Sequence, residues 1–147
     1  MSTLKLTIVT PSGLIFPGKD ADGKPLSGDV EMVVVPGAEG ELGILPMHIP
    51  LMTELQPGEL KITQKGVETF LAVGSGFVEV TQDHVSVLTD MALEENEINE
   101  ATAQEAIARA QEALRNGRLG GEDVATVESN LAKSLAQLHV KRRRHHS

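Results

Sequence analysis

The residues that break helices are gathered in one part of this chain of 147 residues. All seven prolines and eleven of the fourteen glycines lie before residue 94. Because proline and glycine end helices and favour turns, long helices are disfavoured in residues 1–93 and allowed in residues 94–147. Residues 1–93 carry 12 acids and 5 bases, net −7, whereas residues 94–147 carry 9 acids and 8 bases, net −1. We therefore expect two domains, 1–93 and 94–147.

Short apolar stretches with alternating polar residues run through the first domain. Leu4, Leu6 and Ile8 alternate with polar neighbours, which is typical of a strand with one buried face. Similar stretches follow at residues 30–35, 60–63, 69–73, 77–81 and 85–89. Many short strands separated by turn residues predict an antiparallel sandwich or barrel. Residues 19–26 are polar and contain Asp22-Gly23 and Pro25, so we expect an exposed hairpin loop or insertion there.

The second domain has the pattern of two helices. Residues 99–115 contain neither glycine nor proline, Asn99 can cap their start, and Asn116-Gly117 can end them. The residues that share one face of this helix are Ala103, Ile107, Ala110 and Leu114. After Gly120-Gly121, Asp123 is predicted to cap a second helix. Its apolar positions are Val124, Val127, Leu131, Leu135 and Leu138. Together they predict an antiparallel two-helix hairpin.

The first helix offers little apolar surface for packing. Only Ile107 and Leu114 are bulky on its inward face. Burying each gains about 1.5–3 kcal/mol and burying an alanine methyl about 0.8, while ordering each residue costs about 1–2 kcal/mol of backbone entropy. We therefore expect a hairpin that is marginally held on the sandwich and able to leave it. A permanently docked helical pair is the alternative.

Composition disfavours several classes of function. The chain has no cysteine, which excludes disulfides, zinc–thiolate sites and cysteine nucleophiles. A net charge of −8, no Trp and no Tyr argue against nucleic-acid binding. No apolar run approaches the roughly 20 residues that span a bilayer, and the N-terminus does not resemble a signal peptide. A cytoplasmic protein is expected.

Motifs for catalysis, cofactors or metals are not found. The glycine-rich segment 36–43 lacks the Lys-Ser/Thr ending of a P-loop, and Gly74-Ser75-Gly76 precedes a strand instead of a helix. The histidines form no metal-binding pair, and no Gly-x-Ser-x-Gly is present. The residues therefore predict no catalytic residue, no cofactor and no metal site, but an adaptor or regulator.

Residues 36–51 read Pro-Gly-Ala-Glu-Gly-Glu-Leu-Gly-Ile-Leu-Pro-Met-His-Ile-Pro-Leu. This stretch closely resembles the signature of the epsilon subunits of F-type ATP synthases. Residues 74–80, 85–90 and 131–138 resemble later parts of that family in order, so the likeness covers nearly the whole chain, with residues 19–26 as a local insertion. The resemblance implies a ten-stranded sandwich of two sheets followed by a helical hairpin.

The resemblance also implies a non-catalytic role in the rotating central stalk. The sandwich would bind the gamma subunit and the ring of c subunits, and would help couple ring rotation to ATP synthesis in the catalytic head. Attachment to the membrane would be only through the complex, on the cytoplasmic face of a bacterial plasma membrane or the equivalent face of another energy-coupling membrane. An unrelated β-sandwich adaptor with a helical appendage is the alternative.

Two residues of the signature are implied in the contact with the c ring, Glu41 and His48. An exposed polar loop that reaches the polar loops of the ring would make physical sense of both. Pro46 and Pro50 stiffen the backbone around His48. Alternatively, His48 caps or braces its own loop.

The hairpin resembles the family's inhibitory element, which in an extended form rises along gamma into the head and stops ATP hydrolysis. The basic residues that could face an acidic segment of the catalytic beta subunit are Lys133, Lys141, Arg142, Arg143 and Arg144. Screening over about 8 Å at physiological salt lets such charges bias a marginal equilibrium but not hold the hairpin alone. A solvated basic tail is the alternative for the terminal arginines.

Some members of the family bind ATP through Ile/Leu-Asp-x-x-Arg-Ala at the start of the first helix. The matching positions here are Ile98, Asn99, Thr102 and Ala103. Asn replaces the Asp, and Thr replaces the Arg. Because the guanidinium is a strong charge-assisted partner, its loss predicts weak ATP binding or none.

Overall fold

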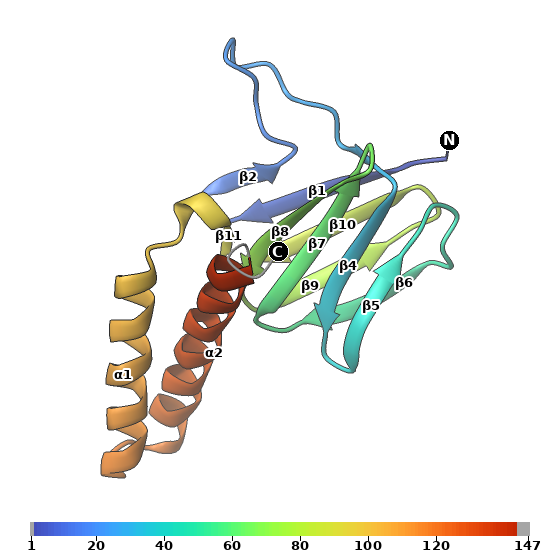
Figure 1. Cartoon of the computed structure of the whole chain (residues 1–147). Helices are drawn as coiled ribbons and strands as arrows, with labels where there is room; N and C mark the ends of the chain where they lie inside the picture. The colour runs from blue at the N-terminus through green and yellow to red at the C-terminus, as the bar shows by residue number, and fades with distance from the viewer. Residues whose placement is uncertain (1, 144–147) are drawn as a thin grey trace.

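The computed structural model describes residues 2–143, which form a β-sandwich followed by two helices (Figure 1). The strands are β1 (Leu4–Thr10), β2 (Gly13–Phe16), β3 (Asp29–Val30), β4 (Met32–Gly37), β5 (Gly40–Ile44), β6 (Leu51–Leu55), β7 (Gly58–Gln64), β8 (Val67–Val73), β9 (Gly76–Val80), β10 (His84–Thr89) and β11 (Ala92–Glu94). The 3-10 turn η1 (Glu95–Glu97) leads to the helices α1 (Glu100–Asn116) and α2 (Gly121–Arg143). The predicted sandwich followed by a helical pair is confirmed.

The strands make two layers. One layer has the order β11-β8-β7-β4-β5, and the other contains β6-β9-β10-β1, with β2 and β3 both paired to β1. The layers join where Gly37 of β4 pairs with Leu55 of β6. The core lies between them and is made of the inward side chains of both, among them Leu6, Ile8, Val33, Val35, Leu60, Ile62, Leu71, Val78 and Val87.

Strand β1 follows the alternation of apolar and polar residues in its sequence. Leu4, Leu6 and Ile8 are buried at alternate positions, as their spacing predicts. Its pairing differs from the prediction: β1 runs parallel to β10, with Leu6 opposite Val85. The other strand pairs are antiparallel, so the expected all-antiparallel sheet is corrected at this one pair. Within residues 2–143 the strands number eleven, not ten, counting the two-residue β3.

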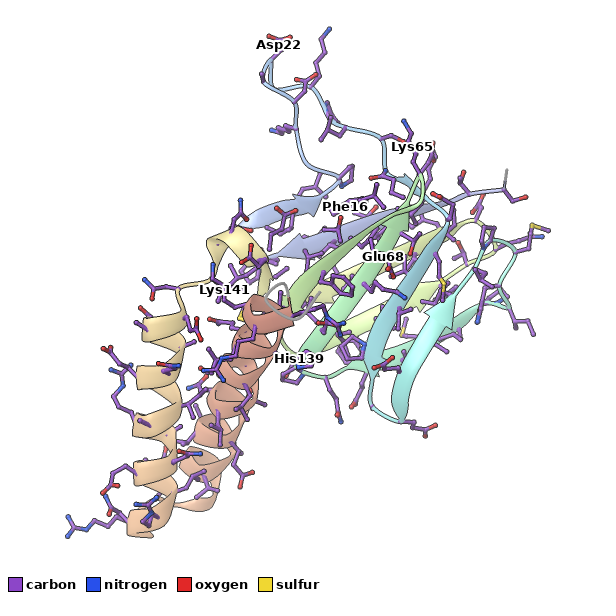
Figure 2. The ribbon with its side chains drawn as sticks, in the orientation of Figure 1. Phe16, Asp22, Lys65, Glu68, His139 and Lys141 are labelled. Atoms are coloured by element: carbon purple, nitrogen blue, oxygen red, sulfur yellow. The ribbon has the colours of Figure 1, made fainter. Side chains whose placement is uncertain are left out.

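The loop between β2 and β3 projects from the sandwich (Figure 1). Its two arms meet in an isolated bridge between Lys19 and Pro25. The Asp20 carboxylate accepts hydrogen bonds from the backbone N–H groups of Asp22 and Lys24, both at 2.9 Å, and Asp22 lies at the tip (Figure 2). The predicted exposed hairpin loop is confirmed.

Helix α1 begins and ends at the predicted signals. The side-chain oxygen of Asn99 accepts from the backbone N–H of Thr102 at 3.0 Å, which satisfies one of the unpaired donors of the first turn. Gly117 ends the helix in the left-handed conformation, with φ of 65°.

Helix α2 begins at Gly121, three residues before the start that a cap at Asp123 predicts. Its first turn is already formed at Gly121, where the backbone N–H of Val124 donates to the carbonyl of Gly120 at 2.9 Å. Asp123 is therefore inside the first turn, where a carboxylate favours the positive end of the helix without capping it. The predicted cap at Asp123 is wrong.

Two sides of α2 are covered, by α1 on one side and by β7, β8 and η1 on the other (Figure 1). A single apolar stripe does not describe such a helix. Leu135, which the spacing places on the inward face, is 49% exposed, whereas Ser134, Ala136 and Val140 are buried. Small residues permit the close approach of the helix to the sheet.

Candidate functional site: the interface between hairpin and sandwich

A small apolar cluster holds α2 against the outer face of the sandwich. Its buried members are Ala72, Ile98, Ala136 and Val140, and Phe70, Met91 and Leu93 pack around them. Only Ile98 and Val140 are bulky and fully enclosed, and each gains about 1.5–3 kcal/mol on burial. This cluster is separate from the sandwich core, so the hairpin could leave without opening that core.

Charged groups surround this cluster. Lys133 Nζ lies 2.7 Å from Asp90 Oδ2, and Lys141 Nζ lies 3.2 Å from Glu95 Oε1. Lys141 also donates to the backbone carbonyl of Glu95 at 3.3 Å. Figure 2 shows Lys141 at the end of α2 that meets the sandwich. Because these pairs are partly solvated, each contributes about 0.2–1 kcal/mol.

Arg142 ties the two helices together. Its Nε donates to Glu100 Oε1 at 2.9 Å, so the last turn of α2 is bonded to the first turn of α1. Glu100 therefore serves both as an acid at the positive end of α1 and as the partner of a base at the negative end of α2.

Arg143 makes the most elaborate contact. Its Nε donates to Glu59 Oε2 at 2.7 Å and a terminal nitrogen donates to Oε1, a two-pronged arrangement that suits a guanidinium. Its charged carbon also lies 4.4 Å from the centre of the Phe70 ring. The hydrogen bond with Glu59 raises the pKa of Arg143 above its ordinary value, and the nearby carboxylates add to this. His139 Nε2 lies 3.5 Å from Glu59 Oε2, on the same carboxylate.

Four of the five basic residues expected to reach the catalytic head are thus occupied within the chain. Lys133, Lys141, Arg142 and Arg143 each pair with a carboxylate in this docked arrangement. The interpretation as a freely solvated tail does not hold for Arg142 and Arg143. Arg144 lies outside the described residues.

The carboxylate partners are the functional residues that sequence reasoning missed. They are Glu59, Asp90, Glu95 and Glu100. For Glu59 and Asp90 the one available signal was the excess of acids before residue 94, which indicates a negative surface without saying which acid meets which base. Glu95 and Glu100 lie after that stretch.

Glu41 and His48 do not share one loop. Glu41 lies within β5, paired with Pro36 of β4, whereas His48 lies beyond the other end of that strand. The expectation of a loop position for Glu41 is therefore corrected. His48 Nδ1 lies 2.7 Å from the carbonyl oxygen of Ile49, and because a carbonyl only accepts, Nδ1 carries the hydrogen. This bond is the kind that internal bracing of the loop predicts.

The residues at the degenerate nucleotide motif have structural roles. Ile98 is buried in the apolar cluster, Asn99 caps α1, and Ala103 is buried. Thr102 is exposed and has no charge to offer a phosphate. A groove of about 440 Å³ does lie between the helices, lined by Arg109 and Lys133 among others, but Lys133 is already paired with Asp90.

Residues 2–143 contain no cluster of three side chains suited to hold a metal ion. In the same part of the chain, none of the helices has the length and apolar character needed to cross a bilayer.

Comparisons with known proteins agree over nearly the whole chain. Residues 3–95 match the family model described as the β-sandwich domain of the ATP synthase delta/epsilon chain, and residues 96–142 match its long α-helix domain. The relative "ATP synthase epsilon chain" of Alkalilimnicola ehrlichii is 42% identical over 144 residues, covering 97% of this chain and 95% of its own. The relative of the same name from Dehalococcoides mccartyi strain BAV1 is 42% identical over 147 residues, covering 99% and 98%.

A solved structure has the same fold. A chain in the cryo-EM structure of the Euglena gracilis mitochondrial ATP synthase matches with a TM-score of 0.74 at 20% identity, covering 95% of this chain and 81% of its own.

Proposed function

Because this chain belongs to the ATP synthase delta/epsilon family, we propose that it is a non-catalytic subunit of the rotating central stalk. Its sandwich binds the gamma subunit and the ring of c subunits, and it helps couple rotation of the ring to ATP synthesis in the catalytic head. It reaches the membrane only through the complex, on the cytoplasmic face of a bacterial plasma membrane or its equivalent. Glu41 and His48 are the proposed contacts with the c ring.

The second part of the proposal concerns the hairpin. Extended, it enters the catalytic head and inhibits ATP hydrolysis through Lys133, Lys141, Arg142, Arg143 and Arg144. Docked, it cannot do so, because four of these bases are bonded to carboxylates of the chain itself. This double use of the same side chains is the observation that carries the proposal, since the bases cannot satisfy both sets of partners at once.

The test is ATP hydrolysis by the reconstituted complex with a hairpin that can be locked. The chain has no cysteine, so Asp90→Cys with Lys133→Cys gives one defined pair at positions whose side chains meet in the docked form. Bridging the two thiols with a short bismaleimide should keep the hairpin docked and raise hydrolysis. The two single-cysteine variants treated with the same reagent are the controls. Equal hydrolysis by bridged and unbridged complexes would remove the inhibitory role.

Deletion of residues 95–147 provides a second measurement. The truncated chain should still assemble through the sandwich, whose core does not include the hairpin, and hydrolysis should rise. Loss of assembly would contradict the division of roles between the two parts of the chain.

A further inference from the structure

Glu41 and the last turn of α2 share one small polar hollow. The hollow has a volume of about 230 Å³, and its charged lining residues are Glu41, Glu59, Lys61, Glu68 and Arg143. Glu41 comes from β5, the next three from β7 and β8, and Arg143 from the C-terminal end of the hairpin. Glu41, which is proposed for partner contact, therefore lies beside Arg143, which bonds the end of the hairpin to Glu59.

The acids of this hollow differ in how they are engaged. Glu59 binds Arg143, and Glu68 pairs with Lys61 at 3.0 Å. Within residues 2–143, no hydrogen bond or ion pair engages the carboxylate of Glu41, which is exposed. The negative charge of Glu41 nevertheless favours the charged form of Arg143 and so raises the pKa of that guanidinium, after the larger effects of Glu59 and Glu68.

We propose that Glu41 couples partner contact to hairpin docking. Its carboxylate helps to hold Arg143 at the sandwich, and a cationic group of a partner that engages Glu41 neutralises this charge and loosens the end of α2. By linkage the effect is reciprocal: a docked hairpin weakens the attraction of Glu41 for that cation by the same factor. The inference rests on the proposed function only in assigning a partner to Glu41; the coupling to Arg143 lies within the chain.

The size of the effect is limited by solvent. A formed pair of exposed charges changes an equilibrium constant by at most about fivefold. Glu41 forms no ion pair with Arg143, so its effect is smaller than that. Glu41 therefore makes a small change to the docking equilibrium of the hairpin. The apolar cluster and the other ion pairs provide most of the docking free energy.

The test within the chain uses Ala136→Cys as a reporter. Ala136 lies on the buried side of α2 and is 6% exposed, so a thiol there reacts with a maleimide or disulfide reagent only when the hairpin opens. In this background, Glu41→Gln should speed labelling by up to about twofold. Glu41→Lys, which mimics a bound cation, should speed it further. Hydrogen exchange of the α2 amides in variants without the cysteine gives an independent measure of opening.

The matched control is Glu39→Gln, an exposed acid of the turn just before β5 that does not line the hollow. It should leave labelling unchanged. In an Arg143→Gln background, and in about 0.5 M salt, Glu41→Gln should lose its effect. Unchanged labelling with Glu41→Gln, or an equal change without Arg143, would overturn the coupling.

The claim that a partner's cationic group engages Glu41 is tested in the assembled complex. Assembly should speed labelling of Ala136→Cys more in the chain that keeps Glu41 than in the chain that also carries Glu41→Gln. An equal effect of assembly on both chains, with the coupling intact in the free chain, would reject the partner contact alone. Hydrolysis that does not respond to locking the hairpin would reject the inhibitory function and leave the coupling standing.

Discussion

Gly74 leaves the space that the Asp90 carboxylate occupies. A Cβ at position 74 would lie 1.9 Å from Asp90 Oδ1 and 3.3 Å from Lys133 Cε. The ion pair that joins the sandwich to the middle of α2 therefore depends on a residue that takes no part in it, at the turn before β9.

Gly74→Ala should displace Asp90 and break its pair with Lys133. We expect the docked hairpin to lose about 0.2–1 kcal/mol from the pair, with steric strain in addition. Faster thiol labelling of Ala136→Cys would report the loss. Gly18→Ala is the control, because its nearest atom outside its neighbours is 3.9 Å away. Identical labelling of both variants would show that Asp90 adapts without cost.

Glu59→Gln should loosen the C-terminal end of α2. The change removes the charge that Arg143 and His139 share, and because Arg143 is 43% exposed we expect a loss of about 0.5–1.5 kcal/mol. Hydrogen exchange of the last two turns of α2 should quicken accordingly. Glu112→Gln breaks an exposed pair with Arg115 inside α1 and should leave that exchange unaltered.

Asn99→Ala should destabilise α1 by about 1 kcal/mol, because the N–H of Thr102 loses its acceptor. Asn99→Asp keeps an acceptor at the positive end of the helix and should be neutral or slightly stabilising. Thermal unfolding of the full chain measures both. A loss with Asp as large as that with Ala would mean that the cap is not what stabilises this end.

Calorimetric titration of the chain with ATP should show weak binding or none. Asn99 and Thr102 offer no charge, and Lys133 is paired. The double variant Asn99→Asp with Thr102→Arg restores the family motif and should bind more tightly. Micromolar affinity of the unmodified chain would contradict this prediction.

Glu31 should make stability depend on acid pH. Its carboxylate accepts from the backbone N–H groups of Lys65 and Gly66 at 2.7 and 3.0 Å, and these bonds lower its pKa below 4.5. A group whose pKa is lower in the folded chain stabilises the fold above its unfolded pKa and loses that contribution as pH falls through the folded value. Glu31→Gln should therefore lower the unfolding temperature at pH 7 and make little difference to it near pH 3. The control Glu54→Gln should leave the unfolding temperature unchanged at both pH values. An equal difference at both pH values would contradict the linkage.

Local features were readable from the sequence because they depend on neighbours along the chain. The alternation of Leu4, Leu6 and Ile8 predicted β1, and Asn99 and Gly117 predicted both ends of α1. A strand face repeats every two residues and a helix cap acts over three, so no knowledge of distant contacts was needed. The start of α2 was misplaced because Gly120 can begin a helix through its backbone alone.

The contacts of the candidate site join residues far apart in the chain, and only the tertiary structure decided them. Arg143 meets Glu59 across 84 positions, and β1 pairs in parallel with a strand that begins at His84. Any of the many acids could have met any base, since exposed charges attract without regard to identity. The packing of α2 over Ala72 selected Glu59, Asp90 and Glu95 as partners, and the position of β5 placed Glu41 beside Arg143.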